Sequence, residues 1–245
     1  MLRGHLVAAF GGLLDLITSP ACVGCAAAGS PWCEVCNQSI SDRPSRRDPV
    51  PRPDHLPPVY GAASYDGPVK QALAALKEYG RTDLAGPLGS ALARAVATAI
   101  LDLVPGPLDL EFGTVVVLVP VPSSRRAARG RDVDAVHALA VRAARELKAL
   151  GVEVRVHRWV ASRRPRADQT GLSFAGRAQN LAGSMSAKVP SHQLPELSGA
   201  RLVIVADDVI TTGATVGEAC RALRTAGVEP AACVAVACTV RRNLR

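Results

Sequence analysis

One segment near the C-terminus constrains the fold more than any other part of the chain. Residues 202–206 (LVIVA) form a continuous apolar run, typical of a strand buried on both faces of a parallel sheet. Two aspartates and a turn rich in threonine and glycine follow at residues 207–215, and apolar residues then recur at helical spacing from Val216 to Leu223. The order strand, acidic pair, turn and helix predicts an α/β fold with this turn at the carboxyl end of a strand.

The turn is suited to hold a phosphate. Backbone N–H groups freed at the turn and at the start of the helix attract an anion, threonine hydroxyls add donors, and a glycine can adopt a positive φ. We therefore predict a phosphate site formed by Thr211, Thr212, Gly213, Ala214 and Thr215. The alternative is purely structural: Thr215 caps the helix, and the two aspartates only begin a loop.

The two aspartates are expected to face a different part of the ligand. Asp207 and Asp208 would repel a phosphate, so they should face hydrogen-bond donors or a cation, such as ribose hydroxyls or magnesium. The chain contains neither GxGxxG nor GxxxxGK[ST], which leaves dinucleotide and Walker-type sites without support. The motif thus predicts a ribose-phosphate ligand.

Apolar strand-like runs alternate with helical patterns from residue 59 onward, which predicts a doubly wound, mainly parallel sheet. Strands are expected near residues 59–65, 114–120, 154–157, 201–206 and 231–238, and helices near 68–77, 84–103, 132–150 and 215–226. Residues 6–17 suggest a short amphipathic helix rather than a signal peptide. No other run is expected to approach the roughly 20 apolar residues that span a bilayer.

Four of the seven cysteines lie within fifteen residues near the N-terminus. Their two CxxC pairs predict one closed, structural zinc site with the ligands Cys22, Cys25, Cys33 and Cys36; redox pairs or free thiols are the alternatives. This usage favours a reducing compartment, and we expect a cytoplasmic protein. The remaining cysteines should be core residues: Cys220, Cys233 and Cys238.

Composition suggests how the chain is divided and which partners it favours. Prolines and arginines crowd residues 43–58, which predicts a solvated linker between a zinc module at 1–42 and an α/β domain at 59–245. The net charge of +8 favours anionic partners, either nucleic acid or phosphorylated metabolites. Aromatic residues make up only 3%, which argues against a dedicated reader of RNA sequence.

Several motifs together resemble the ComF family. Residues 203–215 resemble the phosphoribosyl pyrophosphate motif of type I phosphoribosyltransferases. The cysteine tetrad, YDGP at 65–68, LKEYGR at 76–81, VPVP at 119–122 and QTGLS at 169–173 extend the likeness over nearly the whole chain. The family is named for natural DNA uptake in competent bacteria. The resemblance implies a type I phosphoribosyltransferase-like fold that binds phosphoribosyl pyrophosphate with magnesium.

The resemblance also implies roles for further residues. Pro120 and Val121 end a strand that leads to Arg125 and Arg126, the place where such enzymes bind pyrophosphate. A basic loop at 162–177 would close over the site, and its Arg164 is either a ligand or part of an ordinary surface loop.

Two further features bear on this likeness. Lys77, in the last turn of a helix, is either a ligand or a favourable charge at that helix end. At 129–135 the chain reads RGRDVDA where ComF relatives usually show an RGFNQ-like sequence. Binding of the donor and transfer of its phosphoribosyl group are therefore two separate predictions.

Two functions follow from these observations. The first is a phosphoribosyltransferase that passes the phosphoribosyl group to an acceptor the sequence does not name. The second is a non-catalytic accessory protein that binds single-stranded DNA or DNA-uptake proteins through the same phosphate cradle. A purely structural zinc-linked module would leave residues 207–215 unexplained.

Overall fold

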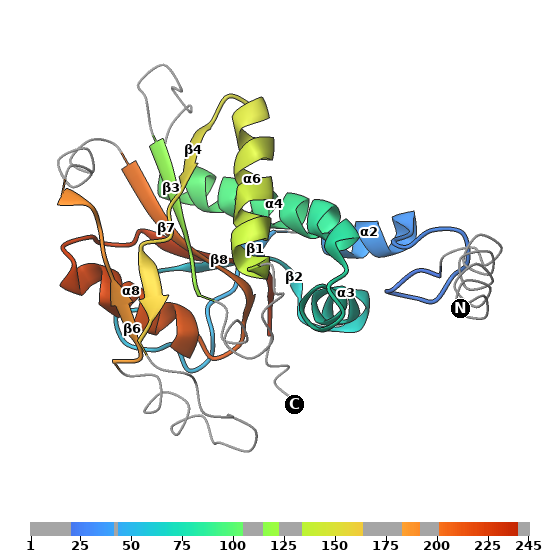
Figure 1. Cartoon of the computed structure of the whole chain (residues 1–245), viewed down its shortest axis with the longest axis horizontal. Coiled ribbons are helices and arrows are strands. Elements are labelled where there is room, and N and C mark those ends of the chain that lie inside the picture. The colour runs from blue at the N-terminus through green and yellow to red at the C-terminus, as the bar shows by residue number, and fades with distance from the viewer. Residues whose placement is uncertain are drawn as a thin grey trace, which may run out of the picture.

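The computed structural model describes residues 21–41, 44–104, 115–122, 134–163, 183–191 and 201–239. A six-stranded sheet with the order β1-β2-β8-β7-β3-β4 forms its centre (Figure 1). The strands are β1 (Ser45–Arg46), β2 (Val59–Ser64), β3 (Val115–Pro120), β4 (Glu153–Val156), β7 (Arg201–Ile210) and β8 (Ala232–Cys238). Only β1 pairs antiparallel with its neighbour in this sheet. The predicted α/β class with a mainly parallel sheet is confirmed.

Helices cover both faces of the sheet. One face packs against α2 (Glu34–Ser41), α3 (Gly67–Glu78), α4 (Ala85–Leu103) and α6 (Ala135–Ala149), with the 3-10 turn η1 (Thr82–Leu84) before α4. The other face packs against α8 (Ala214–Thr225) and a small antiparallel sheet of β5 (Val160–Ser162) and β6 (Met185–Ala187). Figure 1 shows α4 and α6 on the opposite side of the sheet from α8 and β6. The sequence predicted the four longer helices but not α2, β1, β5 or β6.

Strand alternation divides the side chains of β7 between these two cores. Ile204 and Ala206 belong to the core beneath α4 and α6, whereas Val203 and Val205 belong to the core beneath α8. Both sets are buried, which explains why the run is apolar at every position.

The last strand residues depart from the expectation. β7 was expected to end at Ala206, but it continues to Ile210 because its pairing with β8 persists. Asp207 lies opposite Ala235 and Val209 lies opposite Ala237. The acidic pair is therefore part of the strand. The alternative in which the two aspartates only begin a loop is wrong on this point.

One helical segment contradicts the expectation that no further run approaches membrane-spanning length. Thr82–Leu103, which comprises η1 and α4, has 22 residues, and an apolar window of 18 of them has a mean hydropathy of 1.5, enough to cross a membrane by length and composition. Its packing accounts for this composition, because α4 contacts α6, β2 and β8, and 56% of the apolar window is buried. It is a core helix of the domain in the part of the chain that the structure describes.

The proline-rich segment before β2 is exposed at some positions and packed at others. Ser45 and Arg46 pair with Tyr60 and Gly61 to add an edge strand, and Leu56 is buried in the core beneath α8. Edge positions tolerate proline-rich neighbours, so the composition is compatible with sheet pairing. The boundaries of the three predicted domains remain predictions, and the helix expected at 6–17 lies outside the described residues.

Candidate functional site

The phosphate turn joins β7 to α8. Gly213 has a φ of +76° and is the residue before the first helical position, Ala214. The Ala214 N–H donates to Thr212 Oγ1 at 3.3 Å, and the Gly217 N–H donates to the Gly213 carbonyl at 2.8 Å. Thr215 lies inside the first turn of the helix, so the alternative in which it is the capping residue is wrong.

An open hollow lies over this turn. Its lining comprises Asp207 and every residue from Val209 to Val216. All five predicted phosphate-binding residues are therefore brought together with one of the two aspartates. Since the turn opens at the start of α8, the positive end of the helix dipole also faces the hollow.

The two aspartates differ in their surroundings, although both are nearly buried, at 7% exposed for Asp207 and 3% for Asp208. Successive strand side chains point to opposite faces, and only Asp207 lines the hollow. Each carboxylate accepts one backbone hydrogen bond of 2.8 Å, from the N–H of Asp208 and of Val209 respectively. One carboxylate thus faces the turn, and the other faces the side of the sheet that carries α3.

Lys77 reaches Asp208 from the last turn of α3. Its ammonium forms an ion pair with Asp208 Oδ2, and its side chain is 38% exposed, whereas that of Asp208 is 4% exposed. An opposite charge offsets part of the cost of burying a carboxylate. The structure therefore brings Lys77 to the acidic pair, although not to the lining of the hollow.

The end of β3 lies beside the same part of β7. Pro120 is in register with Ala206, and the Val121 N–H donates to the Ala206 carbonyl at 2.9 Å. The predicted residues Pro120 and Val121 are thus next to the acidic pair. The other predicted basic ligands lie outside the described residues, together with most of the basic loop: Arg125, Arg126 and Arg164.

Asp134 lies at the end of the 129–135 segment, whose residues 129–133 are outside the described part of the chain. It is the N-cap of α6, and its Oδ1 accepts from the His137 N–H at 3.3 Å. Its Oδ2 also pairs with Arg158 at 3.4 Å. An aspartate cap satisfies an N–H at the helix start, so this residue has a structural role here.

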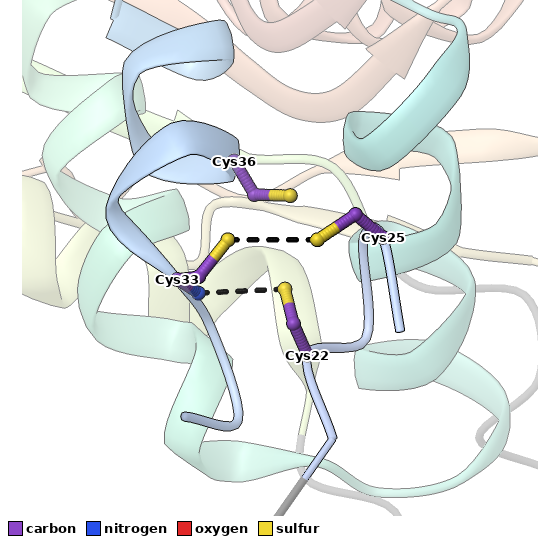
Figure 2. A group of neighbouring side chains, drawn as sticks. All are labelled: Cys22, Cys25, Cys33 and Cys36. Atoms are coloured by element: carbon purple, nitrogen blue, oxygen red, sulfur yellow. Dashed lines mark hydrogen bonds between the residues drawn. The ribbon is translucent and has the colours of Figure 1, made fainter. Parts of the chain in front are cut away.

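The four N-terminal cysteines converge (Figure 2). Their sulfur atoms all lie within 4.8 Å of one another, and the Cys25 and Cys33 sulfurs are 3.6 Å apart. A tetrahedral zinc with Zn–S bonds of about 2.3 Å needs sulfur–sulfur distances of about 3.8 Å. The four thiolates could hold a zinc ion after only small shifts.

Hydrogen bonds favour a thiolate at one of these positions. Burial raises the pKa of Cys22, but N–H groups of Cys33, Cys25 and Gly24 outweigh it and lower the pKa to about 6. One of these bonds, from Cys33 N–H to Cys22 Sγ, measures 3.4 Å. At Cys36 burial prevails, and the pKa of this thiol is raised. A bound cation would relieve this cost, because thiolates are the form that binds metal.

The cysteine module is docked on α3, the helix that carries Lys77. A Cβ on Gly24 would lie 2.7 Å from Cys36 Sγ and 2.8 Å from Pro68 Cβ, so only glycine fits between the cysteine turn and the start of α3. The side-chain amide nitrogen of Gln71, when it faces the cysteine turn, donates hydrogen bonds to the carbonyls of Val23 and Gly24. Nothing in the cysteine spacing indicated this contact.

The remaining cysteines are core residues, as predicted. Cys220, Cys233 and Cys238 are each at most 1% exposed. The sulfurs of Cys220 and Cys233 lie 3.6 Å apart between α8 and β8. Burial raises the pKa of Cys238 to about 12, so the buried thiol is protonated at neutral pH.

Comparison with known proteins agrees with this geometry. Residues 138–245 match the family described as Phosphoribosyl transferase domain. The matched range includes β7, the turn and α8. The fold and the site therefore agree with a phosphoribosyltransferase-type domain in this part of the chain. The chain is also 44% identical over 61 residues to Competence protein F of Haemophilus influenzae. With its four-cysteine cluster, the chain is similar to ComF-type, phosphoribosyltransferase-like proteins. The aligned stretch covers 25% of this chain and 25% of that relative.

Proposed function

We propose that this protein binds phosphoribosyl pyrophosphate together with magnesium and transfers its phosphoribosyl group to an acceptor. The observation that carries the proposal is the hollow that joins the Gly213 turn to the Asp207 carboxylate. The turn offers backbone N–H groups to a phosphate, and Asp207 offers an acceptor to ribose hydroxyls. One ligand that carries both groups, such as a ribose 5-phosphate, would satisfy both parts of the site.

The transfer itself needs positioning more than covalent chemistry from the protein. The bond between ribose C1 and the pyrophosphate oxygen breaks, and a bond from C1 to the acceptor forms. Asp207 would hold the ribose while the turn holds the 5-phosphate, so that C1 is presented to the acceptor. Magnesium would neutralise charge on the leaving pyrophosphate. Arg125, Arg126 and Arg164 remain predicted pyrophosphate ligands.

Asp208 and Lys77 would support this arrangement from the other face of β7. Their ion pair links α3 to the strand end and leaves Asp207 as the carboxylate in the hollow. We also propose that the cysteine cluster binds a structural zinc, because four thiolates close the coordination shell. A cytoplasmic location remains part of this proposal.

Titration calorimetry with phosphoribosyl pyrophosphate, with and without magnesium, tests the proposal. We expect saturable binding that depends on magnesium. Asp207→Asn should weaken that binding by at least about tenfold, since a charge-assisted hydrogen bond contributes roughly 1.5–3 kcal/mol. Glu153→Gln is the matched control, because it removes the same charge from a 51% exposed side chain on the edge strand β4.

Two results would contradict the proposal. One is the absence of binding at millimolar donor; the other is a folded Asp207→Asn variant whose affinity stays within threefold of the unmodified protein. Release of pyrophosphate in the presence of candidate acceptors separates transfer from binding alone.

The second candidate function is that of a DNA-uptake accessory protein. The printed name of the relative, Competence protein F, and the net charge of +8 favour it. Binding of single-stranded DNA through phosphates would weaken steeply with salt, and Asp207→Asn would leave it unchanged or strengthen it. Measuring both ligands on the same variant therefore distinguishes the two functions.

A further inference from the structure

The segment from the cysteine module to β2, residues 44–58, crosses the molecule to the phosphate turn; we refer to it as the strap. Its first residues form β1 on the edge of the sheet. Leu56, near its end, is 4% exposed and belongs to the core beneath α8. A proline-rich segment could remain exposed, so the burial of Leu56 indicates that the strap packs against a particular part of the domain.

Hydrogen bonds and ion pairs hold the strap in one shape. Asp48 Oδ1 accepts from the Val59 N–H at 2.9 Å, and Asp48 Oδ2 accepts from Arg46 Nε at 3.0 Å. Arg52 donates to the Leu56 carbonyl at 2.5 Å, and its other terminal nitrogen lies 3.6 Å from Asp48 Oδ2. These contacts within the segment restrain its conformation, so its side chains are held in place against a neighbour.

The neighbour is the glycine of the phosphate turn. A Cβ on Gly213 would lie 2.9 Å from Leu56 Cδ2, 3.1 Å from Pro49 Cγ and 3.5 Å from Pro53 Cγ. Leu56 also approaches Gly217, one helical turn later, where the corresponding distance to Cδ1 is 3.8 Å. Three apolar side chains of the strap therefore pack against the backbone of the turn and the first turn of α8.

We propose that the strap is a positioning element for the donor site, with Leu56 as its principal positioning residue. This inference rests on the proposed function of the turn. A glycine at φ +76° has more conformational freedom than any other residue, yet its neighbouring N–H groups bind a phosphate well only when they are held in one direction. The strap supplies this restraint from outside the domain segment that matches the phosphoribosyl transferase family.

Leu56→Ala tests the inference through two measurements. Affinity for phosphoribosyl pyrophosphate with magnesium should fall by about 10- to 100-fold, because small displacements of binding groups have effects of this size. Amide hydrogen exchange in peptides that cover residues 211–215 should become faster. Leu56→Met keeps the volume and should restore both values.

Two controls separate positioning from general loss of stability. Val50→Ala changes a strap residue that is 68% exposed and should alter neither measurement. Leu147→Ala truncates a side chain of α6 that is 2% exposed and lies in the other core. It should lower the melting temperature but leave donor affinity unchanged. If Leu56→Ala does not fold, Pro53→Ala removes a smaller contact and takes its place.

The outcomes distinguish this inference from the proposed function. Folded Leu56→Ala protein with affinity within threefold of the unmodified protein and unchanged exchange at 211–215 would overturn the strap's role. If the unmodified protein does not bind the donor, the proposed function fails, and the exchange measurement alone decides whether the strap restrains the turn.

Discussion

The cysteine cluster and the phosphate turn are two candidate ligand sites built in opposite ways. The cluster uses side chains: four thiols from one short stretch meet within 4.8 Å. The turn uses backbone groups: its glycine has a positive φ and packs against side chains about 160 residues earlier in the chain. A site made of local side chains is encoded by their spacing, whereas a backbone site depends on what packs behind it.

Removing one thiol should have the largest effect. Cys36→Ser should reduce the zinc content from about one per chain to near zero and unfold the module, because zinc binding contributes on the order of 10–16 kcal/mol in small zinc modules. Metal analysis and thermal unfolding measure this. Cys220→Ala is the control, since this cysteine lies in the core beneath α8 and should leave the zinc content unchanged. Unmodified protein that contains no zinc after purification without chelators would contradict the assignment.

A side chain at the turn glycine should have the next largest effect. Gly213→Ala should cost about 1–3 kcal/mol of stability, because alanine is strained at this positive φ. Its Cβ would also meet Leu56, so we expect donor binding to be lost. Gly217→Ala is the matched control: the added methyl has ordinary contact distance, and alanine should stabilise the helix by about 0.5–1 kcal/mol. Equal donor affinity in both variants would mean that the turn does not bind phosphate.

The ion pair behind the strand should have the smallest effect. Asp208→Asn should cost about 1 kcal/mol and weaken donor binding less than Asp207→Asn, because Lys77 is 38% exposed and water can hydrate the freed ammonium. A double-mutant cycle with Lys77→Met, followed by denaturant unfolding and calorimetry, isolates the pair. If Asp208→Asn abolishes donor binding while Asp207→Asn does not, the assignment of faces is wrong.

Much of the fold and part of the site could be predicted from sequence. The strand–turn–helix order around Gly213 and the four longer helices were indicated by local periodicity and turn chemistry, which act over a few residues. The fate of the strap could not be predicted, because prolines and arginines allow both a solvated linker and a packed edge. Nothing in the sequence around Leu56 indicates its contact with Gly213, about 160 residues later in the chain.

Sequence by itself determined the chemistry that each site offers: four thiols in CxxC spacing, and an acidic pair followed by a hydroxyl-rich glycine turn. Only the tertiary structure decided which groups act together. It extended β7 through the acidic pair, so that strand alternation sends Asp207 toward the hollow and Asp208 toward Lys77. It also brought the strap onto the turn. These outcomes depend on sheet pairing and on packing between distant segments, and the spacing of neighbouring residues predicts neither of them.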